Sequence, residues 1–145
     1  MNILVTGGAG YVGSVLLPEL VKDGHSIKCL DRFFFGDEFL SQKQFDGKIE
    51  LIKGDAIKTI PKFVLDNPHV LISLMYLDFD LYEPTKVALE NLVPRMPKGA
   101  VIAFDELDNP LWPGETQAMI EFCKDNKLRI QRFPFDPFIG YAVLK

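Results

Sequence analysis

The sequence predicts an α/β protein with a Rossmann-like, doubly wound sheet that is mostly parallel. Three features carry this prediction. Short β-branched apolar segments alternate with helical segments along the 145 residues, a glycine-rich turn follows the first strand, and only the last connection between strands is as short as a hairpin. Because parallel neighbours need a long crossover connection, this alternation places helices on both faces of one sheet.

The first half of the chain, residues 1–57, is predicted to form a dinucleotide-binding half with three strands. Each strand is a short apolar run bounded by glycine or polar residues, and these runs cover 2–6, 26–31 and 49–53. A helix is expected over 11–22, ending at Gly24. Its apolar face should consist of residues that recur at intervals of three and four, namely Val12, Val15, Leu16, Leu20 and Val21.

The second half, residues 58–145, is predicted to add further strands and helices to the same single domain. Strands are expected over 70–77, 100–104, 128–133 and 139–144, and helices over 56–66, 84–96 and 115–126. Pro61 should start or interrupt the first of these helices. The short turn at 134–137 requires a last strand that is antiparallel. The expected strand order is 3-2-1-4-5-7-6.

Composition and charge exclude several classes of partner. Sixteen Lys and Arg residues against twenty Asp and Glu residues give a net charge of -4, so no positive field is available to hold nucleic acid. No apolar run is long enough to cross a membrane, and no secretory signal is recognisable. The two cysteines lack metal-site spacing, which favours reduced thiols in a cytoplasmic protein. The expected partner is a small-molecule dinucleotide, and the oligomeric state is not predicted.

A glycine-rich turn lies between the first strand and the first helix. Gly7, Gly10 and Gly13 are spaced by three residues in the segment Thr6-Gly7-Gly8-Ala9-Gly10-Tyr11-Val12-Gly13. The first glycine permits a tight turn, the second lets a pyrophosphate approach backbone N–H groups at the helix start near Tyr11 and Val12, and the third allows close helix–strand packing. Asp31 ends the second strand, where its carboxylate can accept hydrogen bonds from a ribose.

On these residues, the first 57 positions resemble the extended short-chain dehydrogenases, the NAD-dependent sugar epimerases and dehydratases. The likeness rests on MNILVTGGAGYVGS, on Leu30-Asp31-Arg32 and on Leu51-Ile52-Lys53-Gly54-Asp55. It implies that Asp55 and the adjoining Ala56 lie beside the adenine and that Asp31 favours NAD. Arg32 leaves NADP open, because an arginine at this place can accommodate a 2′-phosphate.

The catalytic set of that family does not follow. Tyr82 and Lys86 match its Tyr-x-x-x-Lys spacing, but they come after the fourth strand with Pro84 between them, so we interpret the match as coincidence. Residues 62–145 instead resemble the macrocin-type O-methyltransferases, which act on sugars. This likeness rests on Ile72 to Thr85, on Ala100 to Glu106 and on Trp112-Pro113-Gly114.

The second resemblance implies a different chemistry from the first. Asp78, Asp105 and Glu106 match the family's Mg²⁺ ligands and Asp80 matches its general base, and carboxylate oxygens suit a hard cation. The two halves therefore point to different cofactors. Our leading hypothesis is an NAD(H)-binding domain, a fused or engineered chimera with little or no catalysis. The alternative is a Mg²⁺-dependent sugar O-methyltransferase that uses S-adenosylmethionine, and a fold that binds no ligand is a third possibility.

Overall fold

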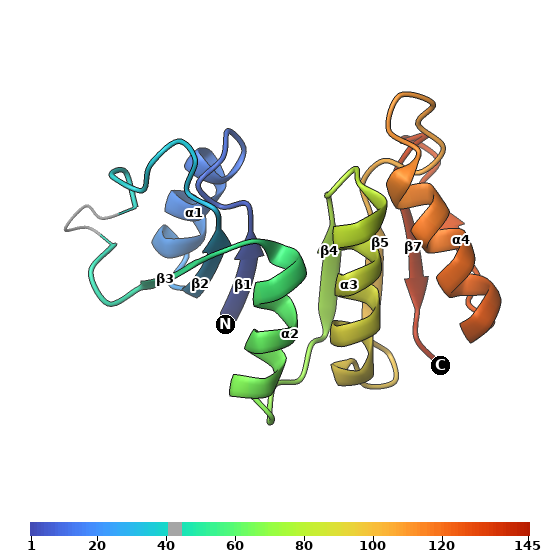
Figure 1. Ribbon diagram of the computed structural model, residues 1–145. Coiled ribbons are helices and arrows are strands. Elements are labelled where there is room, and N and C mark those ends of the chain that lie inside the picture. Colours follow the sequence, from blue (N-terminus) through green and yellow to red (C-terminus); the bar gives the residue numbers. More distant parts are fainter. Residues whose placement is uncertain (41–44) are drawn as a thin grey trace. The chain divides into compact units, whose positions relative to one another are not determined.

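The computed structural model describes residues 1–40 and 45–145, which form two compact units, Met1–Thr59 and Ile60–Lys145. Each unit combines strands with helices, and the strands include parallel pairs (Figure 1). The fold class is therefore α/β and Rossmann-like, as predicted. None of the described helices is both long enough and apolar enough to span a membrane. The expectation that residues 1–145 form one domain stays a prediction.

The first unit is built on a three-stranded parallel sheet with β2 in the middle. Its strands are β1 (Asn2–Thr6), β2 (Ser26–Asp31) and β3 (Ile49–Lys53), and their bounds are those predicted. The helix α1 (Gly13–Lys22) connects β1 to β2 and ends before Gly24, whose φ of 84° only glycine adopts readily. A buried cluster lies between this helix and the sheet; it comprises Ala9, Leu17, Val21, Ile27, Cys29, Leu40 and Phe45.

The predicted apolar face of α1 was partly wrong: Val21 is buried and Leu20 packs against the buried cluster, but the other three residues do not face it. The buried residues of this helix are Gly13, Leu17 and Val21. Three of the predicted face residues are exposed instead, namely Val12 at 64%, Val15 at 70% and Leu16 at 41%. A Cβ added to Gly13 would lie 2.1 Å from the carbonyl oxygen of Gly8, so the helix approaches the turn with this glycine foremost. That contact between backbones sets the rotation of α1, and spacing of apolar residues alone does not reveal it.

The second unit carries a four-stranded sheet in the order β4-β5-β7-β6. The strands are β4 (Leu74–Leu77), β5 (Val101–Phe104), β6 (Gln131–Arg132) and β7 (Gly140–Val143). β4 and β5 are parallel, whereas β7 runs antiparallel to both of its neighbours, which confirms the predicted direction of the last strand. The order within each sheet agrees with the predicted series, and the predicted adjacency of β1 and β4 stays a prediction.

Three helices and a short 3-10 turn accompany these strands. They are α2 (Ala56–Asp66), which begins in the last residues of the first unit, α3 (Tyr82–Leu92) with the 3-10 helix η2 (Val93–Arg95) behind it, and α4 (Gly114–Asn126). α3 and α4 pack against each other. The prediction that Pro61 starts or interrupts this helix was wrong, because α2 begins at Ala56 and continues through Pro61 to Asp66. Proline has no N–H, so it removes one helical hydrogen bond, here the bond to the carbonyl of Ile57.

Two predicted strands are shorter than expected. The apolar run at 70–77 pairs only from Leu74 onward, because Val70 N–H donates to the Asn67 carbonyl in a turn and Ile72 N–H donates to the Arg95 carbonyl. The run at 128–133 contributes only Gln131 and Arg132 to the sheet. Both segments are apolar enough for strands. Their remaining backbone groups are bonded to partners outside the sheet or are left to solvent, so the strands are short.

Candidate functional site

The glycine-rich turn of the first unit is held by its own backbone. Gly7 has a φ of 69°, its N–H donates to the Leu30 carbonyl at 2.8 Å, and its carbonyl accepts from Gly10 N–H at 3.0 Å. A Cβ on Gly10 would lie 3.1 Å from the Gly7 carbonyl oxygen, and Gly13 tolerates no Cβ at all beside Gly8. No side chain caps the start of α1, but the N–H groups of Ser14 and Val15 already donate to the carbonyls of Gly10 and Val12, so an anion there would be held by the N–H groups that precede them.

Asp31 ties this turn to the end of β2. One oxygen of its carboxylate, Oδ2, accepts from Ala9 N–H at 2.8 Å, and the other, Oδ1, accepts from Phe33 N–H at 2.7 Å. The acid thus orders the glycine turn as well as offering its remaining lone pairs to a ligand. The sequence indicates the second role from position alone, but not the first.

Arg32, Asp55 and Ala56 lie at the same carboxyl edge of the three-stranded sheet. The Arg32 guanidinium is 3.5 Å from Asp55 Oδ2 and lies over the ring of Phe34, 4.4 Å from its centroid. Asp55 also accepts from Ile57 N–H at 3.0 Å, so it caps the helix that Ala56 begins. Arg32 is therefore already paired with a carboxylate, which competes with any phosphate for its charge.

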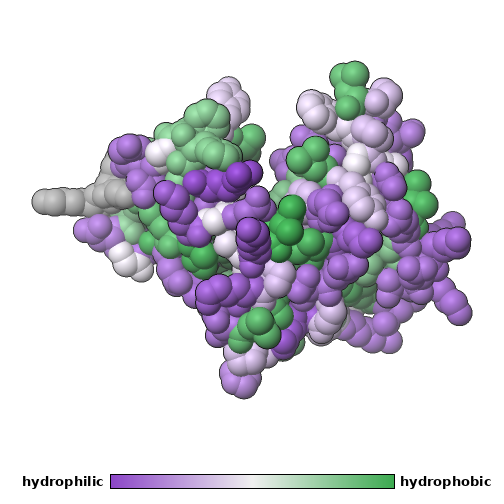
Figure 2. Space-filling model, in the orientation of Figure 1, coloured by the Kyte–Doolittle hydropathy of each residue, from purple (hydrophilic) through white to green (hydrophobic). Residues whose placement is uncertain are grey.

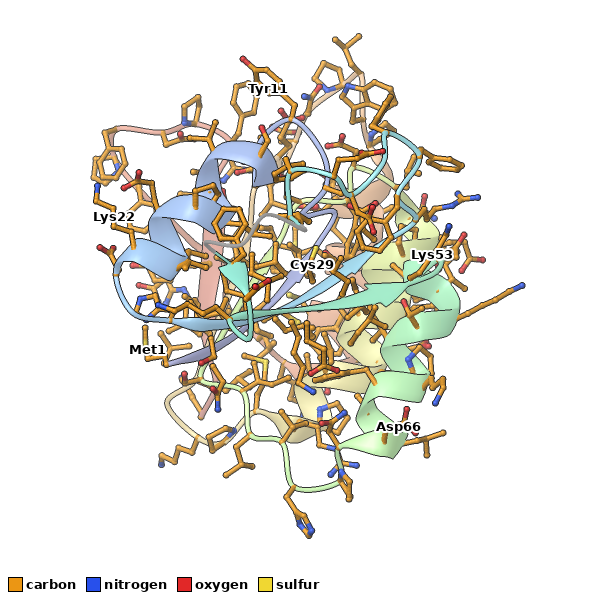
Figure 3. All side chains as sticks on the ribbon, turned by 90° about the vertical axis from the view of Figure 1, so that its left-hand side faces the viewer. Met1, Tyr11, Lys22, Cys29, Lys53 and Asp66 are labelled. Atoms are coloured by element: carbon orange, nitrogen blue, oxygen red, sulfur yellow. The ribbon has the colours of Figure 1, made fainter. Side chains whose placement is uncertain are left out.

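Apolar side chains gather on the surface around this turn. Tyr11 is 95% exposed and Phe35 90% exposed, and Val12 and Phe34 are exposed as well. Figure 2 shows hydrophobic residues over the start of α1 and the loop after β2, and Figure 3 shows Tyr11 projecting outward from the start of α1. Exposed apolar surface of this kind in a small unit is typical of a ligand or partner site.

The second unit places four carboxyl groups at the ends of two adjacent strands. Asp78 and Asp80 follow β4, and Asp105 and Glu106 follow β5. The two strands are parallel and Leu77 pairs with Phe104, so both end at the same edge of the sheet. Asp80 has a φ of 58°, a left-handed conformation that aspartate tolerates better than most residues.

These acids repel one another. Burial, and then the charges of Asp105, Asp80 and Glu106, raise the pKa of Asp78 above its usual range. Burial, together with Glu106 and Asp105, likewise raises the pKa of Asp80. Among the described residues, no Lys or Arg forms an ion pair with any of the four. The edge is therefore negatively charged and lacks a protein cation to balance it.

Two of the four carboxylates have protein partners. Asp105 accepts from the Tyr76 hydroxyl, and Glu106 Oε2 accepts from Asn109 Nδ2 at 2.6 Å. Burial and this bond to Asp105 raise the pKa of Tyr76. In the described part of the chain, no three Asp, Glu, His or Cys side chains converge as a metal site. The donor chemistry suits a hard divalent cation, and the oxygens of Asp105 and Glu106 that these bonds leave open would have to converge with Asp78 to bind it.

Glu115 lies behind these acids at the start of α4 and is fully buried, at 0% exposure. Its Oε2 accepts from Phe79 N–H at 3.3 Å and its Oε1 from Glu106 N–H at 3.4 Å. Burial raises its pKa to about 7 against the lowering effect of these amides, and Asp78 adds a smaller increase. The sequence predicts only that this residue begins a helix. A glutamate in the first helical turn is ordinarily solvated, so no local signal distinguishes it.

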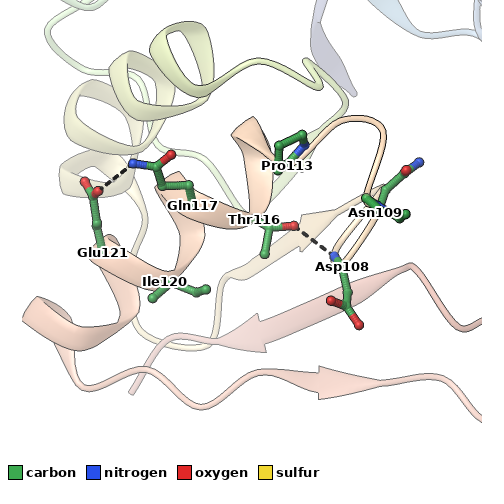
Figure 4. A pocket seen from close by; sticks show the side chains of 8 residues that line it. Asp108, Asn109, Pro113, Thr116, Gln117, Ile120 and Glu121 are labelled. Atoms are coloured by element: carbon green, nitrogen blue, oxygen red, sulfur yellow. Dashed lines mark hydrogen bonds between the residues drawn. The ribbon is translucent and has the colours of Figure 1, made fainter.

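A groove of about 410 Å³ runs along the first turns of α4, beside the loop that precedes it (Figure 4). Pro110, Pro113 and Ile120 form its apolar walls. Two hydrogen bonds lie on opposite sides of the groove: Gln117 donates to Glu121 at 3.3 Å, and Thr116 accepts from Asp108 N–H at 2.8 Å.

The Tyr82 and Lys86 pair does form a contact. Lys86 Nζ donates to the Tyr82 hydroxyl at 3.1 Å, and this hydroxyl donates to Glu121 Oε2 at 2.7 Å. The hydroxyl thus links α3 to α4 with its proton directed at a carboxylate.

The predicted site residues fall into two groups. The nucleotide-binding candidates Gly7, Gly10, Tyr11, Val12, Gly13, Asp31, Arg32, Asp55 and Ala56 all belong to the first unit. The candidates for cation binding and proton transfer, Asp78, Asp80, Asp105 and Glu106, all belong to the second. Each group lies at the carboxyl ends of its own parallel strands, which is where α/β proteins bind ligands.

Comparison with known proteins shows likeness to two families. A family model described as a methyltransferase domain matches residues 5–107. Among solved structures, CalS11, a TDP-rhamnose 3′-O-methyltransferase of calicheamicin biosynthesis, aligns with a TM-score of 0.75 and 30% identity, over 98% of this chain and 71% of that one.

Curated proteins with similar sequences include epimerases and decarboxylases of UDP-sugars. UDP-glucuronic acid decarboxylase 1 of Danio rerio is 33% identical over 98 residues, which is 63% of this chain and 22% of that protein. UDP-glucose 4-epimerase of Lactobacillus helveticus is 31% identical over 105 residues, which is 72% of this chain and 28% of that protein. The chain thus spans about a quarter of the length of these relatives. The mixed resemblance found in the sequence is confirmed.

Proposed function

Since the chain belongs to the methyltransferase-domain family, we propose that it transfers a methyl group from S-adenosylmethionine to a sugar hydroxyl with the aid of Mg²⁺. Likeness to a TDP-rhamnose 3′-O-methyltransferase over nearly the whole chain supports a sugar acceptor. Methyl transfer was the alternative to NAD(H) binding in the sequence analysis. We prefer it here because the methyltransferase family model matches residues in both halves of the chain.

The observation that carries the proposal is the crowding of four carboxyl groups at the ends of β4 and β5. Asp78, Asp105 and Glu106 are the ligands we assign, because they follow two neighbouring parallel strands and no described Lys or Arg forms an ion pair with them. A bound Mg²⁺ supplies Lewis acidity that makes an acceptor hydroxyl easier to deprotonate. A cation would also relieve the repulsion that raises the pKa of Asp78 and Asp80.

Asp80 is the base in this proposal. Its backbone is fixed, since its carbonyl accepts from Glu115 N–H at 3.2 Å and its φ is left-handed. No described hydrogen bond or ion pair occupies its carboxylate, in contrast to those of Asp105 and Glu106. Asp80 would take the proton of the acceptor hydroxyl as the oxygen forms its bond to the methyl carbon, while the bond from that carbon to the donor sulfur breaks and S-adenosylhomocysteine leaves as a thioether.

The first unit would hold the nucleoside part of the methyl donor. S-adenosylmethionine supplies an electrophilic methyl carbon on a sulfonium sulfur. Asp31 offers carboxylate lone pairs to the ribose hydroxyls, and the exposed rings around Tyr11 and Phe34 offer apolar surface to the adenine.

The test is methyl transfer from labelled S-adenosylmethionine to nucleotide sugars such as TDP- and UDP-hexoses, with and without Mg²⁺. We expect transfer that requires Mg²⁺, is lost in Asp78→Asn and Asp80→Asn, and survives in Glu121→Gln. The last variant removes one carboxylate of the same unit that is bonded to Tyr82 and Gln117. Equal rates in chelator and in Mg²⁺, or a rate that Asp78→Asn leaves intact, would refute the cation site.

A second candidate, an NAD(H)-binding chimera with little or no catalysis, is favoured by the glycine turn and by the epimerase-like relatives. Calorimetric titration with NAD⁺, NADH and S-adenosylmethionine separates the two. Binding of NAD that weakens at least tenfold in Gly10→Val and Asp31→Ala, and not in Gly24→Ala at the far end of α1, would support this candidate. Binding of S-adenosylmethionine alone would dismiss it.

A further inference from the structure

We propose that Glu115 is a positioning residue that holds the two acidic loops in place for the cation. This inference rests on the proposed function, because it assigns a task to a residue behind the proposed ligands. Glu115 belongs to neither group of predicted site residues, and it touches both loops that carry the four carboxyl groups.

The contacts of Glu115 join segments that are far apart in the sequence. Through Oε2 it accepts from the N–H of Phe79, which stands between Asp78 and Asp80, at 3.3 Å. Through Oε1 it accepts from the N–H of Glu106 at 3.4 Å. Its own N–H donates to the Asp80 carbonyl at 3.2 Å. One residue of α4 therefore connects the loop after β4 with the loop after β5.

The neighbouring glycine makes this bridge possible. A Cβ on Gly114 would lie 2.4 Å from the Tyr82 nitrogen and 2.7 Å from the Asp80 carbonyl oxygen. The helix start thus reaches the backbone of the first acidic loop directly. This close approach brings Glu115 within hydrogen-bonding distance of both loops while its side chain is wholly buried.

A carboxylate suits this place better than any similar side chain. It has two acceptor oxygens and no donor, so it can serve two N–H groups at once. A glutamine has one acceptor oxygen and would turn its NH₂ group toward the second N–H. An aspartate has the same acceptors but is one methylene shorter. Burying a carboxylate is costly, and among the described residues no Lys or Arg forms an ion pair with it.

The experiment compares the wild type with Glu115→Gln and Glu115→Asp, and takes Glu121→Gln as the matched control. Glu121 lies on the same helix but is exposed and bonds to Tyr82 and Gln117. The first measurement is amide hydrogen exchange by NMR on the metal-free protein at about pH 8, where Glu115 is ionised. We expect the Phe79 and Glu106 N–H groups both to exchange at least tenfold faster in Glu115→Asp, and one of the two to do so in Glu115→Gln, while amides in the middle of β5 stay protected.

The second measurement is calorimetric titration with Mn²⁺, which stands in for Mg²⁺ and needs no substrate. Residues behind metal ligands commonly change affinity by about 10- to 100-fold. We expect a loss in this range for Glu115→Gln and Glu115→Asp, and less than a twofold change for Glu121→Gln.

The outcomes separate this inference from the proposed function. If the wild type binds no Mn²⁺, the proposed cation site fails, and amide exchange alone decides whether Glu115 orders the loops. If Asp78→Asn abolishes Mn²⁺ binding while both Glu115 variants keep the wild-type affinity and amide protection, the positioning role is overturned. Global loss of protection in β5 would also overturn it, since Glu115 would then support the whole fold and not the loops.

Discussion

The buried carboxyl of Glu115 makes the stability of this protein depend on pH. Its pKa rises from an ordinary 4.5 to about 7 in the folded protein. Between these values the folded protein holds a proton that the unfolded chain has lost, so raising the pH favours unfolding. The contribution is fully present below about pH 4.5, falls as the pH rises, and is lost above about pH 7. A pKa increase of this size corresponds to about 3 kcal/mol.

Urea unfolding followed by fluorescence measures this effect in the relevant unit. Trp112 is the single tryptophan of the chain and belongs to the second unit, as Glu115 does. The free energy of unfolding should be measured from about pH 5 to about pH 8 for the wild type and for Glu115→Gln. The difference between the two curves isolates Glu115, because the remaining acids are common to both proteins.

The change with pH in the difference between the two free energies of unfolding tests whether the pKa of Glu115 is raised. The wild type should lose stability relative to Glu115→Gln as the pH rises, by up to about 3 kcal/mol. The raised pKa values of Asp78 and Asp80 act in the same direction in both proteins, and the lowered pKa of Asp136 acts in the opposite one. A difference that stays constant over this range, or that grows in favour of the wild type, would refute a raised pKa for Glu115.

Further predictions concern both units. Gly13→Ala places a Cβ against the Gly8 carbonyl and should lower the free energy of unfolding by about 1–3 kcal/mol, as measured with urea. An unchanged midpoint of urea unfolding would contradict this close approach. Tyr82→Phe removes the hydrogen bonds to Glu121 and Lys86 and should cost about 1 kcal/mol or less while leaving methyl transfer unaltered; loss of activity would instead make Tyr82 catalytic. Burial raises the pKa of Cys29 to about 11, so its thiol should react with a thiol reagent at about pH 8 only after the protein is unfolded. Rapid reaction of the folded protein would contradict the burial of this thiol.

Much of the secondary structure follows from local sequence. The bounds of β1, β2, β3 and α2 were predicted correctly because each is a compact run of apolar or helix-forming residues with glycine or polar residues on either side. The places of the glycine turn and of Asp31 were predicted for the same reason. Strand lengths at 70–77 and 128–133 were overestimated, since pairing partners, and not apolar character, decide where a strand begins and ends.

By itself, the sequence determined the α/β class, the glycine turn and the acids at the strand ends, because hydrophobic period, glycine spacing and strand-end acids are local features. The expected strand order and the roles assigned to the acids came from the two family resemblances. Only the tertiary structure decided the rotation of α1 against Gly8, the amide partners of Asp31 and the role of Glu115 between two acidic loops. These depend on contacts between backbone atoms distant in the chain, and a backbone N–H or carbonyl is the same at every position of the sequence.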